Sequence, residues 1–295
     1  MAIESSEVNI AFIINPISGI SQKKKIRRQI PKIFGDGNFK YTIVETEYEG
    51  HAIDLASEMS KNHDIVVAVG GDGTLNEVVR GILNTDTKLG IVPCGSGNGL
   101  ARHLKISLNS ARALKAIKNG QEHSINTIMF NGKPFINVSG IGFDALVAHK
   151  FAESARRGIW SYFKNTIRVY FGFKPIEVTI TIENQTFERK ALLVTFANSS
   201  QFGYNATISP ISDVSDGAME VCILKPFSFF KSVIVVAARL FTKRMHKSKH
   251  LEIIRTKKVS IITKTPVASH IDGSPYVIDT RFEVEINKKS ITAIF

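Results

Sequence analysis

The segment DIVVAVGGDG, residues 64–73, constrains the fold more than any other part of the sequence. Its apolar run has no polar face, which is typical of a strand in a parallel sheet that is covered on both sides. Directly after it, apolar residues recur at i, i+3, i+4, i+7 and i+8, the spacing of one helix face. These positions are Leu75, Val78, Val79, Ile82 and Leu83. The pattern predicts a buried parallel strand followed by an amphipathic helix.

The same alternation of strand and helix runs through the first part of the chain, to about Gln121. Further strands are expected at 8–15 and 40–46, with another that begins at Leu89, and further helices at 21–34 and 51–62. This order predicts a three-layer α/β domain with a mostly parallel sheet.

After Gln121 the pattern changes to short strands separated by turns. The segments IEVTITIE (176–183) and RFEVEI (281–286) alternate strictly between apolar and polar residues. Such a run predicts an antiparallel sandwich or sheet, with a helical insertion between Ala145 and Tyr170. We therefore expect an α/β domain over residues 1–125 and a β-sandwich domain over residues 126–295. Whether the last strand returns to the first domain stays open.

Charge and cysteine content narrow the range of partners and compartments. The chain carries 38 Lys and Arg residues against 26 Asp and Glu, a formal net charge of +12. Nucleic acid, an anionic membrane and phosphorylated substrates would all suit that charge. No nucleic-acid-binding motif accompanies it, so no nucleic acid is expected. The two cysteines imply no disulfide framework, and the first residues, MAIESSEVN, lack the positive charge of an export signal, so we expect a cytoplasmic protein.

Two basic clusters stand out along the chain. QKKKIRR (22–28) is best interpreted as a solvated helix face. The second cluster, 225–250, interleaves phenylalanines with lysines and arginines. Aromatic and basic residues together suit a membrane surface, and an ordinary packed helix is an equal alternative. No segment has the roughly 20 nearly unbroken apolar residues of a membrane span, so any contact with a membrane would be made from outside.

Two glycine turns carry the strongest chemical signal. Gly70-Gly71-Asp72-Gly73-Thr74 follows one expected strand, and Gly95-Ser96-Gly97-Asn98-Gly99 follows the next. Each turn opens a helix, whose N-terminal N–H groups and dipole suit phosphate, and Thr74 and Ser96 add hydroxyl donors. A Rossmann fingerprint would need glycine at Asn76, and a P-loop would need a lysine that neither turn has. The alternative is a pair of tight βα turns without a ligand.

The turns belong to a set of motifs that resembles the diacylglycerol kinase catalytic domain family. The set begins with NPISG (15–19), GGDGTLNEVVRG (70–81) and PCGSGNGLARHL (93–104). It continues through NVSGIGFDALVA (137–148), then 156–175, 196–221 and HIDGSPY (270–276), so the resemblance covers nearly the whole chain. That family includes lipid kinases and is distantly similar to NAD kinases. The later blocks separate the lipid kinases from the NAD kinases.

The resemblance implies that ATP is the co-substrate, together with Mg²⁺. Positions matching the family's motifs imply a set of ATP-contacting residues: Asn15, Ser18, Thr46, Gly70, Gly71, Gly73, Thr74, Gly95 and Ser96. Glu77 and Asn98 would brace the turns or reach the nucleotide. The loop 213–218 resembles the family's structural metal loop, in which the carboxylate of Asp216 and the backbone oxygens of Asp213 and Ala218 would hold Mg²⁺ or Ca²⁺. An Asp-Gly hairpin turn is the alternative for this loop.

The general base is the unsettled part of this site. The family commonly has Asp-Gly-Glu in its last motif, whereas this chain has Asp272-Gly273-Ser274. The candidate catalytic carboxylates are therefore Asp272 and Asp72. For Asp272 the alternative is a simple turn between two strands.

We interpret the chain as an ATP-dependent lipid kinase that phosphorylates a hydroxyl of a membrane lipid, either diacylglycerol or a sphingosine-like lipid. It is expected to be cytoplasmic, in peripheral contact with the anionic inner surface of the membrane. The alternatives are an NAD kinase-like enzyme and a catalytically impaired protein that binds nucleotide and lipid. The identity of the lipid and the formation of a homodimer stay open.

Overall fold

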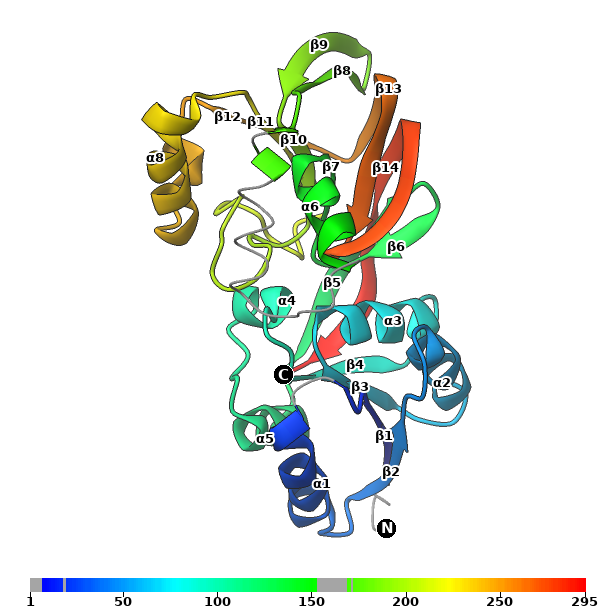
Figure 1. Cartoon of the computed structure of the whole chain (residues 1–295). Coiled ribbons are helices and arrows are strands. Elements are labelled where there is room, and N and C mark those ends of the chain that lie inside the picture. The colour runs from blue at the N-terminus through cyan, green and yellow to red at the C-terminus, as the bar shows by residue number, and fades with distance from the viewer. Residues whose placement is uncertain (1–6, 18–19, 153–168, 171) are drawn as a thin grey trace. The chain divides into compact units, whose positions relative to one another are not determined.

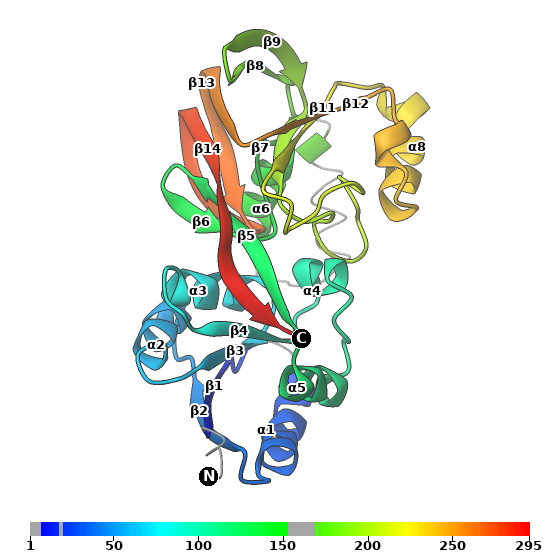
Figure 2. The ribbon, with the colours of Figure 1, turned by 180° about the vertical axis from the view of Figure 1, so that it is seen from behind.

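The computed structural model describes residues 7–17, 20–152, 169–170 and 172–295. The chain divides into two compact units (Figures 1 and 2). Unit 1 comprises Met1–Asn126 and Lys288–Phe295, and unit 2 comprises Thr127–Asn287. Unit 1 is therefore built from two separate stretches of the chain, because the last residues join the first ones.

Unit 1 is built on a parallel sheet. Its strands are β1 (Val8–Ile14), β2 (Phe39–Glu45), β3 (Ile65–Gly70) and β4 (Lys88–Pro93), in the spatial order β4-β3-β1-β2. Neighbouring strands run parallel throughout. Every residue of β3 is buried, as the unbroken apolar run predicted.

Helices cover both faces of this sheet. On one face α1 (Ile20–Phe34) packs on α5 (Ser110–Asn119), and on the other α2 (His51–Met59) packs on α3 (Asp72–Ile82) (Figure 1). The short helix α4 (Gly99–His103) follows β4. In α3 the predicted stripe is confirmed, because Leu75, Val78, Val79 and Ile82 are buried. Unit 1 is thus the three-layer α/β domain that the sequence predicted.

Unit 2 is an antiparallel β-structure. The spatial strand order is β12-β11-β10-β7-β13-β14, with the β8-β9 hairpin joined to β13 and β5 and β6 joined at β14. The strands are β5 (Glu122–Phe130), β6 (Lys133–Phe135), β7 (Val138–Gly142), β8 (Ile176–Ile182), β9 (Gln185–Ala191), β10 (Leu193–Ala197), β11 (Met219–Leu224), β12 (Leu251–Thr256), β13 (Lys258–Ile271) and β14 (Ser274–Ile294). Its helices are α6 (Phe143–Ala152), α8 (Phe229–Phe241) and the 3₁₀ turn η1 (Met245–Lys247).

The predicted alternation in β8 and β14 reflects burial of one face of each strand. In β8, Val178 and Ile180 are buried, and in β14, Phe282 and Val284 are buried. All four residues belong to one apolar core, which also holds Phe130 and Phe196. The β-sandwich prediction for this part of the chain is confirmed. Helix α6 begins the expected insertion at 145–170, of which 153–168 lies outside the described residues.

The C-terminal end of β14 completes the sheet of unit 1. There it pairs in parallel with β4, with Ala293 opposite Leu89 and Ile294 opposite Gly90. Ile291, Ala293 and Ile294 are all buried. The backbone N–H of Lys289 donates to the Asn126 side chain at 3.0 Å, so the two stretches of unit 1 are adjacent where they meet.

We predict that residues 1–126 cannot form a stable unit 1 without residues 288–295. Removing that segment exposes the edge of β4 and loses two buried isoleucines, each worth roughly 1.5–3 kcal/mol. A chain of residues 1–126 should therefore show no cooperative thermal unfolding by circular dichroism. The same chain carrying 288–295 on a short glycine-serine linker after Asn126 should unfold cooperatively. Equal stability of the two chains would contradict the prediction.

Candidate active site

The first glycine turn joins the carboxyl ends of β1 and β3 to the start of α3. Gly70 is the last residue of β3, and Gly71 is the N-cap of α3. The Asn15 side chain, directly after β1, donates from Nδ2 to Oγ1 of Thr74 at 2.9 Å. Its Oδ1 accepts the backbone N–H of Ile17 at 3.0 Å. One amide thus fixes both the loop after β1 and the hydroxyl of Thr74.

The second glycine turn lies against the first. The N–H of Cys94 donates to the carbonyl of Gly70 at 2.7 Å, which extends the pairing of β3 with β4 into the turns. A Cβ on Gly95 would lie 2.5 Å from the Cα of Gly71, so no larger residue fits unless the turns move apart. Close approach of the two backbones therefore requires glycine at position 95.

Asn98 braces the second turn from within. Its Oδ1 accepts the N–H of Gly95 at 2.9 Å, and its Nδ2 donates to the carbonyl of Gly95 at 2.7 Å. The residue takes the left-handed conformation, with φ of 49°, which asparagine tolerates better than most residues. Arg102 adds a bond from Nε to the carbonyl of Gly97 at 2.9 Å.

The carboxylate of Asp72 links the two turns. The backbone N–H groups of Asn98, Gly99 and Leu100, at the start of α4, hydrogen-bond to it. Burial raises the pKa of the Asp72 carboxyl above its usual value, and these three N–H groups limit the rise. Sequence reasoning chose Asp72 as a catalytic carboxylate; in this geometry it holds the second turn against the first. Its catalytic role stays a prediction.

Glu77 fastens a third loop to the same edge. Its Oε1 accepts the N–H of Gly50 at 3.1 Å and its Oε2 accepts the N–H of Ala52 at 3.3 Å, which caps the start of α2. The loop before α2 contains Thr46, which is buried and whose N–H donates to the carbonyl of Ile14. Glu77 is expected either to brace the turns or to reach the nucleotide. Its contacts with Gly50 and Ala52 brace the loop before α2.

Most of the residues predicted to contact ATP therefore gather at one edge of the unit 1 sheet. Asn15, Thr46, Gly70, Gly71, Gly73, Thr74, Gly95, Ser96 and Asn98 all lie at or just beyond the carboxyl ends of its strands. Gly73 and Ser96 are exposed there, so backbone and hydroxyl groups are accessible to a ligand. Ser18 lies outside the described residues. The N-terminus of α3 directs its dipole toward this edge, an arrangement that favours phosphate.

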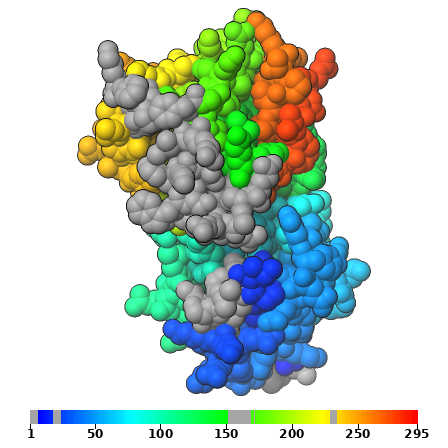
Figure 3. All heavy atoms as spheres, viewed as in Figure 1, coloured from blue at the N-terminus to red at the C-terminus, as the bar shows by residue number. Residues whose placement is uncertain are grey.

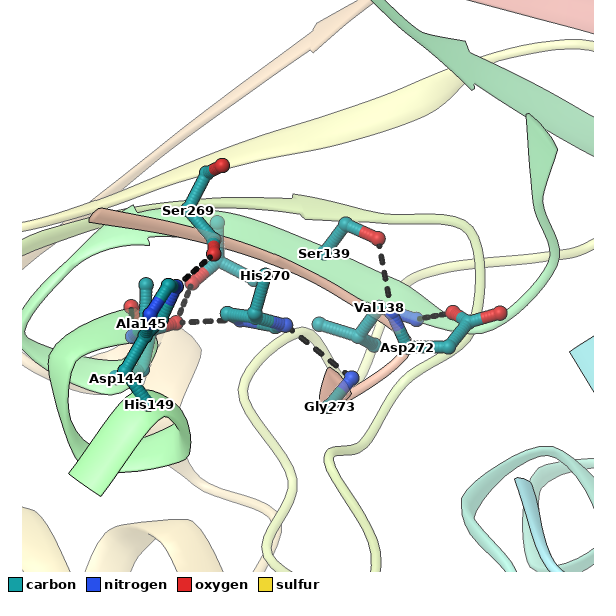
Figure 4. A network of polar contacts seen from close by, with 10 residues as sticks. Val138, Ser139, Asp144, Ala145, His149, Ser269, His270, Asp272 and Gly273 are labelled. Atoms are coloured by element: carbon teal, nitrogen blue, oxygen red, sulfur yellow. Dashed lines mark hydrogen bonds and ion pairs between the residues drawn. The ribbon is translucent and has the colours of Figure 1, made fainter. Parts of the chain in front are cut away.

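Unit 2 contains a second cluster of motif residues, around the turn between β13 and β14 (Figure 4). Asp272 and Gly273 both have positive φ, 47° and 84°, which identifies the turn as a tight two-residue hairpin. The Asp272 carboxylate accepts backbone N–H groups from three successive residues, Ile136, Asn137 and Val138, at 2.9 to 3.1 Å. The turn interpretation of Asp272 thus describes the local structure. Ser274 begins β14 and is exposed.

A buried contact between an aspartate and a histidine lies beside this turn. Nδ1 of His270 accepts the N–H of Gly273 at 3.2 Å, so the neutral ring carries its proton on Nε2. Nε2 lies 3.2 Å from Oδ2 of Asp144, and the hydroxyl of Thr195 donates to the same oxygen at 3.3 Å. Figure 4 shows Asp144 and His149 on α6 facing β13, and Nε2 of His149 lies 3.0 Å from the carbonyl of Ser269.

Sequence reasoning did not single out Asp144 or His270, although both lie in motif blocks. A lone buried histidine has no spacing signal, and Asp144 looks like an ordinary acid in the first turn of a helix. Only the pairing of β7, β10 and β13 brings these groups together. They form a buried polar network beside the turn that carries Asp272 and Ser274.

The loop 213–218 is held by its own side chains and by a neighbouring arginine. Oδ1 of Asp213 accepts both the N–H and the hydroxyl of Ser215 at 2.9 and 2.6 Å. Oδ1 of Asp216 accepts the N–H of Ala218 at 2.9 Å, while Oδ2 pairs with Arg255 at 2.5 Å. Within the described residues, no group of three or more His, Cys, Asp or Glu side chains could hold a metal ion. The guanidinium of Arg255 would compete with a cation for the Asp216 carboxylate, and the metal assignment of Asp213, Asp216 and Ala218 stays a prediction.

Two family profiles match successive parts of the chain. The family profile described as the diacylglycerol kinase catalytic domain matches residues 9–130. The profile described as the YegS C-terminal NAD kinase beta sandwich-like domain matches residues 137–286.

Individual relatives match over most of their length. A diacylglycerol kinase of Bacillus subtilis (strain 168) is 26% identical over 268 residues, covering 89% of this chain and 88% of the relative. A diacylglycerol kinase of Staphylococcus aureus (strain MRSA252) is 26% identical over 274 residues, covering 89% and 84%. A solved diacylglycerol kinase structure from Bacillus anthracis strain Sterne has a TM-score of 0.76 at 22% identity, covering 98% of this chain and 97% of that one. Another structure from that strain has a TM-score of 0.83 at 24% identity, covering 100% and 97%. The solved structures support the fold alone.

We predict that Glu77→Gln changes how stability depends on pH. Burial raises the pKa of the Glu77 carboxyl above its usual 4.5, and the N–H groups of Gly50 and Ala52 limit the rise. Between these two pKa values the folded chain keeps a proton that the unfolded chain has lost. The unfolding free energy contributed by Glu77 therefore falls as pH rises through this window.

Glutamine does not titrate, so the stability of the variant minus that of the wild type should increase as pH rises above the usual pKa of 4.5. Urea unfolding across this range measures the difference. Glu58→Gln, which removes an exposed carboxyl from α2, is the matched control for loss of one negative charge. A difference for Glu77→Gln that stays flat or decreases with pH would count against the assignment.

Proposed function

Because the chain belongs to the diacylglycerol kinase family, we propose that it transfers the γ-phosphate of ATP to a hydroxyl of a membrane lipid. Membership of this family supports a phosphotransferase with ATP as co-substrate. Diacylglycerol is the first candidate substrate, since relatives from Bacillus and Staphylococcus are named diacylglycerol kinases. A sphingosine-like lipid is the second.

The observation that carries the proposal is the contact between the two glycine turns at the carboxyl edge of the unit 1 sheet. Two backbone turns, the N-terminus of α3 and the hydroxyls of Thr74 and Ser96 converge on one edge. The N–H groups of Gly95 and of residues 98–100 are already bonded within the protein. Such an edge can therefore bind phosphates through the start of α3 and the two hydroxyls, without a lysine. Asn15 holds the Thr74 hydroxyl in place for this role.

In the proposed reaction Mg²⁺ would bind together with ATP. In kinases Mg²⁺ is held by one or two carboxylates and by the phosphates of the substrate, where it neutralises developing charge. Asp72 is the carboxylate of the first turn, and its oxygens accept main-chain bonds. The metal would neutralise charge, whereas the residues of this chain would position the phosphates.

We predict that the wild type transfers labelled γ-phosphate from ATP to a lipid in mixed micelles, and that excess chelator abolishes the transfer. The panel contains diacylglycerol, sphingosine, ceramide and, for the NAD kinase alternative, NAD. Gly95→Ala should lower kcat/KM roughly 10²-fold, because the added Cβ forces the two turns apart.

Gly172→Ala is the matched control, since a Cβ there meets no atom of the described residues within 4 Å. Circular dichroism separates loss of activity from loss of folding. Full activity of a folded Gly95→Ala chain would show that the glycine turns do not hold the nucleotide. Transfer to NAD with none to lipid would favour the NAD kinase alternative.

One observation favours a second candidate, a protein that binds nucleotide and lipid with impaired catalysis. Ser274 stands where the family commonly has glutamate, and the neighbouring Asp272 carboxylate accepts three main-chain hydrogen bonds. Neither residue offers an evident general base for a lipid hydroxyl.

We therefore predict that Ser274→Glu raises kcat for the lipid at least about tenfold, since a positioned base contributes typically 10²–10⁴-fold. Ser274 is exposed at the start of β14, so a larger side chain fits. Ser274→Gln is the control, because it has nearly the same size and no carboxylate. If Glu and Gln variants both match the wild type, position 274 is not where the base acts.

A further inference from the structure

Helix α8 buries one side in unit 2. Val236 and Leu240 pack into an apolar cluster that also contains Leu193, Ile208 and Met245. The carbonyl of Leu240 also accepts the N–H of Thr207 at 2.9 Å. The helix is therefore held in place along this side.

The opposite side of α8 is also apolar, and it is exposed. Ile234 is 77% exposed and Phe241 is 59% exposed, although both are large hydrophobic residues. Exposed alanines at 237 and 238 lie between them, which completes an i, i+3, i+4, i+7 stripe. Val235, 48% exposed, widens the stripe. Contiguous apolar surface of this kind marks a site of interaction.

A basic turn follows this face directly. Residues 225–250 contain no aspartate or glutamate. The exposed cations after the helix are Lys243, Arg244, Lys247 and Lys249. Arg239 donates from Nη1 to the carbonyl of Lys247 at 3.0 Å, which folds the segment back on the helix. In Figure 3 the segment forms the yellow and gold surface at the left edge of unit 2.

We propose that the outward face of α8 and the basic turn after it, residues 234–249, dock on an anionic lipid bilayer. Ile234 and Phe241 would enter the boundary between headgroups and acyl chains, and the cations would contact anionic headgroups. The 13 residues of α8 are too few to cross a bilayer, and no helix of the described residues is long and apolar enough to do so. The proposal rests on the proposed function, because it gives the kinase access to its lipid.

Charge favours a bilayer over a second copy of this chain as the occupant. In a symmetric dimer through this patch, two segments that are both basic would face each other, and residues 225–250 provide no acidic partner for the cations. An anionic surface provides opposite charge along the whole segment.

The test measures cosedimentation of the protein with vesicles in the absence of ATP. One set of vesicles is phosphatidylcholine alone, and the other also contains phosphatidylglycerol. Ile234→Ser/Phe241→Ser should weaken binding to the anionic vesicles at least about tenfold, since both apolar side chains leave the interface. Lys243→Glu/Arg244→Glu should weaken it about tenfold or more and reduce the effect of salt. The matched controls are Ile262→Ser/Ile278→Ser, 48% and 63% exposed, and Lys61→Glu/Lys257→Glu, all exposed. These controls should bind as the wild type does.

A site-specific label keeps the test independent of variant stability. Both native cysteines are buried, so an environment-sensitive dye on Phe241→Cys reports on α8 alone. Its emission should shift to the blue with anionic vesicles, while a dye on Ile278→Cys should not shift. Unchanged emission at 241, or unchanged binding of the serine variant, would overturn the proposal. A dimer in solution that dissociates in Ile234→Ser/Phe241→Ser would also overturn it, in favour of a contact between copies.

Turnover of a water-soluble short-chain diacylglycerol separates this inference from the proposed function. The α8 variants should keep that turnover and lose activity only on vesicles. A wild type that binds vesicles through α8 yet phosphorylates no lipid would refute the kinase proposal and leave the docking surface standing.

Discussion

The pairing of β3 with β4 is the constraint on which the candidate nucleotide site depends. Because these parallel strands end opposite each other, their following turns start from the same edge of the sheet. The bond from Cys94 to Gly70 continues the ladder past the strands, and the contact between Gly95 and Gly71 leaves no space for a side chain. These contacts hold both turns in a fixed position relative to the sheet. Main-chain groups can then be oriented toward a polyphosphate before it arrives, which lowers the entropy lost on binding.

Three acidic residues in the motifs of this chain make the same kind of hydrogen-bonding contact. Asp72, Glu77 and Asp272 each direct a carboxylate at two or three main-chain N–H groups of a loop that is distant in sequence or begins another helix. Such charge-assisted bonds fix loops more firmly than bonds between neutral groups. A motif acid therefore does not have to be a catalytic acid. In the interior of unit 2, the hydrogen bond between the side chains of Asp144 and His270 joins α6 to β13.

Local patterns predicted most of the fold because burial imposes them directly. The period of α3 and the alternation of β8 each follow from one face meeting a core. Parallel strands place both glycine turns at the same edge of the sheet, but the pairing of β3 with β4, which brings the turns into contact, is seen only in the structure. In contrast, the partners of Asp272 lie at 136–138, and nothing in the spacing of an Asp-Gly turn indicates them. The contact between Asp144 and His270 likewise depends on strand pairing across the sheet, which a single sequence does not specify.

The route of β14 has a consequence for how the protein is made. Translation delivers residues 1–126 first, but the strand that pairs with the edge of β4 comes from residues 288–294. Until the ribosome reaches that point, the nascent nucleotide domain carries an open, apolar sheet edge while the whole of unit 2 emerges. An edge of this kind can pair with other chains, so a chaperone that shields it would be of most use during this interval. The two units therefore mature in the reverse of their order of synthesis: the sandwich can close first, and the domain at the N-terminus finishes last.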